Sequence, residues 1–173
     1  LPLQTLMTIN LTDTTLIEPA LPNSCTVGSG VCIIEGIYID EIDLPKNYFG
    51  YHLYYNRCCR NGDILNLDNP GGRGMVFHAY IPPTLVENSS PVFSDLPMPF
   101  LCIDDTSSIL NTAFDPDGDQ LLFAFVDPYE DGPYPPFQPN PPATISWPLP
   151  TVPWLNITYN KNFPFGPNGY AYI

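Results

Sequence analysis

Alternating apolar and polar positions run through the first half of the chain and predict short β-strands. Residues 3–11 place apolar side chains on one face, and residues 31–42 are rich in β-branched residues. Residues 48–59 alternate again, and the apolar positions of residues 75–81 stay in phase throughout. Residues 12–30 contain the prolines and glycines of a loop. Because no segment has the 3.6-residue period of a helix, we predict an all-β protein.

The second half repeats this pattern after a linker. Residues 92–103 predict an edge strand, since their prolines lack the backbone donor that a central strand needs. Residues 107–114 and 120–127 predict two strands of a hairpin around the sequence Asp-Pro-Asp-Gly-Asp, the second strand being apolar on both faces. The twelve prolines of residues 128–167 predict a stiff connection with short extended pieces, such as residues 155–160.

These elements predict two Ig-like or cadherin-like β-sandwich modules with proline-rich loops. The first module is expected at residues 1–83 and is incomplete at its N-terminal side. The second is expected at residues 84–173 and is incomplete at its C-terminal side. The 23 prolines among 173 residues, more than twice the usual share of about 5%, agree with short strands and rigid loops rather than helices.

The charge of the chain excludes several classes of partner. It has 5 Lys and Arg against 18 Asp and Glu, for a formal net charge of −13. Such a surface repels nucleic acid and anionic membranes, and no basic patch offsets it. No apolar run is long enough to cross a bilayer, so membrane insertion is not expected. The surface attracts cations instead, and calcium is the cation that carboxylate clusters bind.

Three aspartates within five positions form the strongest candidate site. Asp115, Asp117 and Asp119 do not belong to an EF-hand, which needs glycine at the sixth position and glutamate at the twelfth. Those positions hold Gln120 and Val126. A metal site of another kind, or no metal site, is therefore expected.

Two interpretations of this stretch remain open. A tight turn accounts for Pro116, which presets φ, and for Gly118, which permits positive φ. A structural calcium site accounts for carboxylates placed so close together, because a cation relieves their repulsion. In that interpretation the candidate ligands are Asp115, Asp117, Asp119, Asn88, Glu87 and Asp104.

The cysteines indicate an exported protein. No two of them form a C-x-x-C pair, which argues against a zinc ribbon or a thioredoxin-like motif. Neighbouring side chains of a strand point to opposite faces, so Cys58 and Cys59 are expected to reach different partners, one of them towards Cys102. Cys25 and Cys32 are expected to close a short loop. The pairing stays open, and the disulfide candidates are Cys25, Cys32, Cys58, Cys59 and Cys102.

The sequence does not favour an enzyme. A catalytic cysteine needs a base, yet the only histidines, His52 and His78, fall in strand patterns. Acidic residues such as Glu130 are so frequent that carboxylate pairs arise by chance. An alternative is a glycan-binding module, since aromatic side chains could stack on sugars. These aromatic residues are Tyr129, Tyr134, Phe137, Trp147 and Trp154.

Four stretches follow one another along the chain: YHLYYNRCCRNGDILNLDNPGGRG, ENSSPVFSDLPMPFLCIDD, NTAFDPDGDQLLFAFVDP and FPFGPNGYAYI. With them, residues 22–173 resemble repeat modules of large surface proteins from Bacteroidetes, which are labelled gliding motility-associated and exported by the type 9 secretion system. The combination of the stretches is fairly specific, whereas each alone is weak.

The second half also resembles a cadherin-like domain, in which a linker and an Asp-x-Asp motif bind calcium between modules. The linker here departs from that pattern, because it offers only Glu87 and Asn88 where cadherins have several acidic groups. This departure puts a full multi-ion cluster in doubt. The matching positions are Asn88, Pro91, Phe93, Ala113, Asp115 and Asp117.

The resemblance implies a non-enzymatic structural or adhesive segment of a secreted bacterial cell-surface protein, stiffened by calcium. Its expected location is extracellular, at the bacterial cell surface. Its expected partners are neighbouring modules of the same long chain, other subunits of a surface filament, or surface glycans and proteins.

Overall fold

The computed structural model describes residues 6–17, 32–85, 87–94, 112–130 and 148–163. Within these ranges the chain forms strands and one 3-10 turn, and no α-helix. The strands pair into two-stranded antiparallel sheets. The all-β prediction is thus confirmed, whereas the two sandwich modules stay a prediction. In the described ranges, no helix has the length and apolar character needed to cross a membrane.

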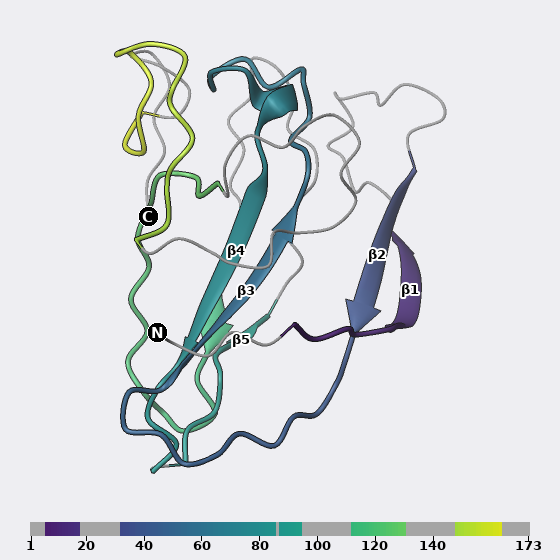
Figure 1. Cartoon of the computed structure of the whole chain (residues 1–173), viewed down its shortest axis with the longest axis vertical. Helices are drawn as coiled ribbons and strands as arrows, with labels where there is room; N and C mark the ends of the chain where they lie inside the picture. Colours follow the sequence, from purple (N-terminus) through teal and green to yellow (C-terminus); the bar gives the residue numbers. More distant parts are fainter. Residues whose placement is uncertain (1–5, 18–31, 86, 95–111, 131–147, 164–173) are drawn as a thin grey trace. The chain divides into compact units, whose positions relative to one another are not determined.

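The longest regular pairing joins β3 (Tyr51–Arg57) to β4 (Met75–Ile81), which lie side by side in Figure 1. The two strands are in register over their full length, from Tyr51 opposite Ile81 to Arg57 opposite Met75. Aromatic and β-branched side chains favour this pleated backbone. The strands predicted at residues 48–59 and 75–81 are therefore confirmed. The connection between them contains the 3-10 turn η1 (Pro70–Gly72).

A second sheet pairs β1 (Leu11–Ile17) with β2 (Ile33–Tyr38). β2 lies inside the strand predicted at residues 31–42. A strand was expected at residues 3–11 and a loop after it. Residues 6–10 form no strand, and β1 extends into the expected loop, whereas residues 3–5 lie outside the described residues. The threonines and the terminal Leu-Ile of β1 suit a strand as well as the preceding apolar residues do, and pairing with β2 decides between them.

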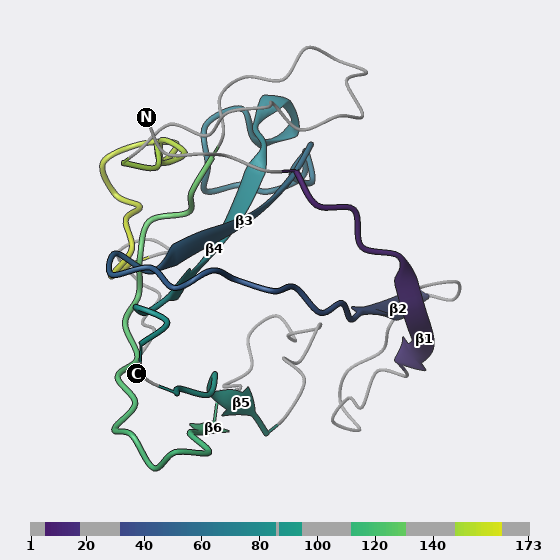
Figure 2. The ribbon, with the colours of Figure 1, turned by 60° about the horizontal axis from the view of Figure 1, so that its bottom comes forward.

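The third pairing is short and joins β5 (Val92–Phe93) to β6 (Ala113–Phe114), as Figure 2 shows. The predicted hairpin between residues 107–114 and 120–127 is not formed by the described residues. β6 lies within the first predicted strand, whose residues 107–111 are outside the described part of the chain. Residues 120–127 form no strand, and Leu122 is 93% exposed rather than buried. β6 pairs with β5 instead of with the apolar run after the turn.

Residues 155–160 form turns instead of the predicted extended piece. The side chain of Asn156 accepts a hydrogen bond from the backbone N–H of Thr158 at 2.9 Å. The carbonyl of Asn156 also accepts from the N–H of Tyr159 at 3.2 Å. Asparagine favours such local bonds over a strand ladder, which explains the difference.

Backbone contacts divide the chain into two units. One comprises Leu1–Leu6, Lys46–Val86 and Leu122–Ile173, and the other comprises Met7–Pro45 and Glu87–Leu121. This grouping is interleaved along the sequence, unlike the consecutive modules expected from the linker, which stay a prediction.

The described core lies in the unit that contains β3 and β4. Its buried apolar side chains are Leu67, Val76, Leu149 and Val152.

Backbone hydrogen bonds to proline carbonyls connect segments of this core. The N–H of Val152 donates to the carbonyl of Pro128 at 2.8 Å, and the N–H of Glu130 donates to that of Pro150 at 2.9 Å. Proline has no donor of its own but keeps its acceptor, so proline-rich segments can still bond to neighbouring backbone. The predicted stiff connection therefore includes a part of the core.

Candidate functional site

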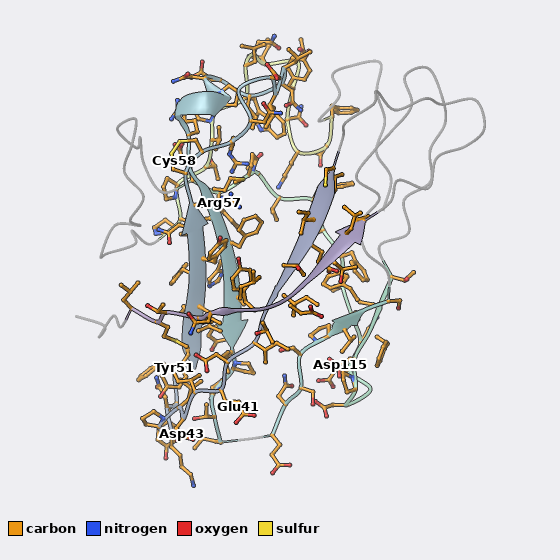
Figure 3. All side chains as sticks on the ribbon, turned by 90° about the vertical axis from the view of Figure 1, so that its right-hand side faces the viewer. Glu41, Asp43, Tyr51, Arg57, Cys58 and Asp115 are labelled. Atoms are coloured by element: carbon orange, nitrogen blue, oxygen red, sulfur yellow. A yellow bond between two sulfur atoms is a disulfide. The ribbon has the colours of Figure 1, made fainter. Side chains whose placement is uncertain are left out.

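The aspartate stretch forms a tight turn directly after β6, where Figure 3 labels Asp115. The N–H of Gly118 donates to the carbonyl of Asp115 at 3.1 Å, and Gly118 has a φ of 83°. The side chain of Asp115 accepts from the N–H of Asp117 at 2.8 Å and from that of Asp119 at 3.4 Å. Asp115 thus accepts hydrogen bonds from the backbone of the turn, and Gly118 adopts positive φ, as predicted. The turn does not, however, connect two strands of a hairpin.

The loop before β5 lies against this turn. The backbone N–H of Ser89 donates to Oδ2 of Asp117 at 2.5 Å, and the Ser89 hydroxyl donates to Oδ1 at 3.2 Å. We call this pair of bonds the Ser89–Asp117 clasp. It joins residues 28 positions apart, within one of the two units. A bidentate contact of this kind orients the carboxylate and keeps the loop close to the turn.

The structure places several of the predicted calcium ligands near one another. Glu87 and Asn88 directly precede Ser89, and Asp115 bonds to the backbone of Asp117. Asn88 uses its amide nitrogen to donate to the carbonyl of Ser89 at 3.0 Å. Asp104 lies outside the described residues. The loop and the turn therefore come together as the calcium interpretation requires.

Calcium binding at this turn requires carboxylate oxygens that can still accept after their hydrogen bonds are counted. Asp117 uses both carboxylate oxygens in the clasp, and Asp115 uses Oδ1 in its own turn. Each carboxylate oxygen has two lone pairs, so one hydrogen bond still allows it to bind a cation. In the described part of the chain, however, no three acidic, histidine or cysteine residues form a group ready to hold a metal. The calcium site stays a prediction.

The cysteine prediction was wrong at the adjacent pair. Cys58 and Cys59 are joined to each other by a disulfide, so neither reaches towards Cys102. The alternation of side chains applies only inside a strand, and β3 ends at Arg57, immediately before Cys58 (Figure 3). Cys32 is exposed with a free thiol, contrary to the expected bridge from it. Cys25 and Cys102 lie outside the described residues.

The buried carboxylate of Glu130 belongs to an ion pair that sequence reasoning missed. Nη1 of Arg73 contacts Oε1 of Glu130 at 3.1 Å, and Nη2 of Arg73 contacts Oδ2 of Asp68 at 3.1 Å. Arg60 donates to the carbonyl of Tyr129 at 2.7 Å. Burial lowers the pKa of the Arg60 guanidinium, and Glu130 opposes that shift. The sequence holds no local pattern for this pair, because Arg73 and Glu130 lie 57 positions apart.

The aromatic residues of the glycan alternative are partly described. Nε1 of Trp154 donates to Oδ1 of Asp127 at 3.0 Å, and Trp154 pairs through its backbone with Leu67. Tyr129 pairs with Thr151 in the same way. Both aromatic side chains are half-buried. Both side chains thus pack partly within their own unit. The other three, Tyr134, Phe137 and Trp147, lie outside the described residues.

Comparison of the chain with protein-family models, with curated proteins and with solved structures found no match.

Proposed function

We propose that this chain is a non-enzymatic structural or adhesive segment of a large secreted bacterial cell-surface protein of the gliding-motility and adhesin type. The Ser89–Asp117 clasp is the observation that carries the proposal. In a cadherin-like module, the linker before the first strand and the Asp-x-Asp turn must meet, because both provide oxygen ligands to the same ion. Here the corresponding loop and turn are bonded to each other.

The short sheet beside the clasp supports the same proposal. The Pro-x-Phe and Ala-x-Asp-x-Asp motifs lie in separate parts of the sequence, and Phe93 of the first pairs with Ala113 of the second. Two motifs that act together in the resembled family are thus neighbours in this fold. The calcium component of the proposal assigns Asp115 and Asp117 as principal ligands and Asn88 as a helper.

A thermal melt tests the calcium component. The oxidised chain is melted with calcium and then with excess EGTA. Binding to the native state alone adds about 2.7 kcal/mol of stability at a calcium concentration one hundred times Kd. That gain raises the midpoint by several degrees. The shift should vanish in Asp115→Asn and persist in Asp63→Asn, an exposed aspartate of another turn. An equal shift in both variants would remove calcium from the proposal.

The surface location needs a separate test. Antibodies against this chain should label intact cells of the source bacterium, and external protease should remove that label. Deletion of the gene should reduce attachment or spreading on surfaces. Labelling only after lysis would contradict the proposed function, whatever the calcium result.

A further inference from the structure

Four ring side chains share one face of the sheet formed by β3 and β4. In the register, His52 lies opposite Tyr80, and Tyr54 lies opposite His78. The two histidines are therefore diagonal neighbours on that face, each facing a tyrosine. At one end of the face Val76 is buried, whereas His78 is half-buried and His52 is exposed at the other. The histidines thus lie between the buried part of this face and its solvent-exposed part.

The rings are close neighbours on this face. The ring centroids of His52 and His78 are 5.1 Å apart at an interplanar angle of 18°, and those of Tyr54 and His78 are 4.9 Å apart at 25°. His52 and Tyr80 are 4.9 Å apart with a larger tilt. The nitrogen-bearing edges of the two imidazole rings face each other across the strand pair, because the centroid separation of 5.1 Å is that of two rings meeting edge to edge through a hydrogen bond.

Two of these nitrogens converge. Nδ1 of His52 lies 2.8 Å from Nε2 of His78, a hydrogen bond in which one nitrogen donates and the other accepts. The proton of this hydrogen bond lies between the two nitrogens, where the lone pair of the acceptor and the N–H of the donor both point. A metal ion with nitrogen distances of about 2.0–2.1 Å in tetrahedral geometry places its ligands about 3.4 Å apart. The two nitrogens would separate by roughly half an ångström to admit such an ion.

We propose that His52 and His78 bind a divalent transition-metal ion of the Cu²⁺, Ni²⁺ or Zn²⁺ class between β3 and β4, with water completing the coordination. Imidazole nitrogens select these ions, whereas calcium takes oxygen ligands. The net charge of −13 raises the local concentration of any cation. This site is separate from the proposed calcium ligands and does not rest on the proposed function.

Copper spectroscopy on the whole chain tests the site. Free thiols are first blocked with iodoacetamide, because Cys32 is exposed and would compete for the metal. With one equivalent of Cu²⁺, electron paramagnetic resonance should show coupling to two imidazole nitrogens. In His52→Gln and in His78→Gln the coupling should fall to a single nitrogen, and Ni²⁺ affinity measured by calorimetry should fall at least about tenfold, because a direct ligand is lost.

A matched control separates ligands from neighbours. Tyr54→Phe keeps the stacked ring but removes its hydroxyl, so it should bind metal as the unchanged chain does. Unchanged affinity in both histidine variants, or copper without nitrogen coupling, would overturn the proposal. If the histidine variants fail to fold, paramagnetic broadening of the unchanged chain decides, because Cu²⁺ should broaden resonances of β3 and β4 first. Broadening centred elsewhere would also overturn the proposal.

Discussion

Gly50, at the start of the sheet formed by β3 and β4, is the described glycine at which a side chain would meet the closest contact. Its φ is 70°, and a Cβ there would lie 2.3 Å from the backbone carbonyl oxygen of Ile81. Gly50→Ala should reduce the free energy of unfolding by at least about 1–3 kcal/mol, since positive φ alone costs that much in a residue with a side chain. Urea unfolding, followed by circular dichroism, measures the change.

Gly62→Ala is the matched control for that substitution. No atom lies within 4 Å of a Cβ placed on Gly62. Its effect should stay within about 0.5 kcal/mol, as for other open surface positions. Equal destabilisation by the two alanines would show that the backbone at Gly50 is not the cause.

The metal-free chain should lose stability in mild acid because His78 becomes protonated more easily when the chain unfolds. Burial lowers the pKa of His78 from its usual 6.5, and the neighbouring His52 lowers it further. Unfolding therefore raises the affinity of His78 for a proton. The contribution of neutral His78 to stability is fully present above pH 6.5 and is lost as the pH falls through the lower pKa of the folded state. The other ring side chains on this face are those of Tyr54 and Tyr80.

Urea midpoints in the presence of chelator, taken stepwise from pH 7.5 to lower pH, check this direction. The midpoint should fall in the unchanged chain and change less in His78→Gln. The same fall in both proteins would assign the effect to other groups.

At the scale of elements, the ion pair between Arg73, which follows η1, and Glu130 joins two segments distant in sequence. The side chain of Glu130 is only 9% exposed. Arg73→Met should cost about 3 kcal/mol of stability, because it removes the cation that is hydrogen-bonded to a buried carboxylate. Glu130→Gln should cost less, since its amide can still accept from Arg73, which keeps Asp68. Equal losses in chemical denaturation would contradict this order, and Arg57→Met serves as an exposed control.

Strands with strong alternation could be predicted, and those that depend on a choice of partner could not. Residues 75–81 were predicted at the bounds that β4 has. Residues 120–127 have an equally apolar pattern, yet they form no strand, and β6 pairs with β5. The turn at Asp115 was predictable because its hydrogen bonds are local, whereas the clasp from Ser89 to Asp117 spans 28 positions and left no local pattern.

For the whole molecule, we expect acidic charge to oppose association through the many exposed apolar side chains of the described residues. These include Phe49, Leu65 and Ile157, which are 86%, 81% and 98% exposed. The net charge of −13 disappears near the isoelectric point of about 4.1 as carboxylates are protonated. Self-association should therefore rise steeply as the pH falls from 7 towards 4. Light scattering at constant ionic strength measures it, and a scattering intensity independent of pH would contradict the expectation.

The β-strands, the turn at Asp115 and the acidic surface follow from the amino-acid sequence alone. Proline content, alternation and turn residues act over a few positions, so their effect does not depend on what lies nearby in space. Which segments meet is set by the fold: β5 with β6, His52 with His78, and Arg73 with Glu130. These contacts depend on strand register and chain path, which arise from the packing of many residues at once and leave no signal at any single position.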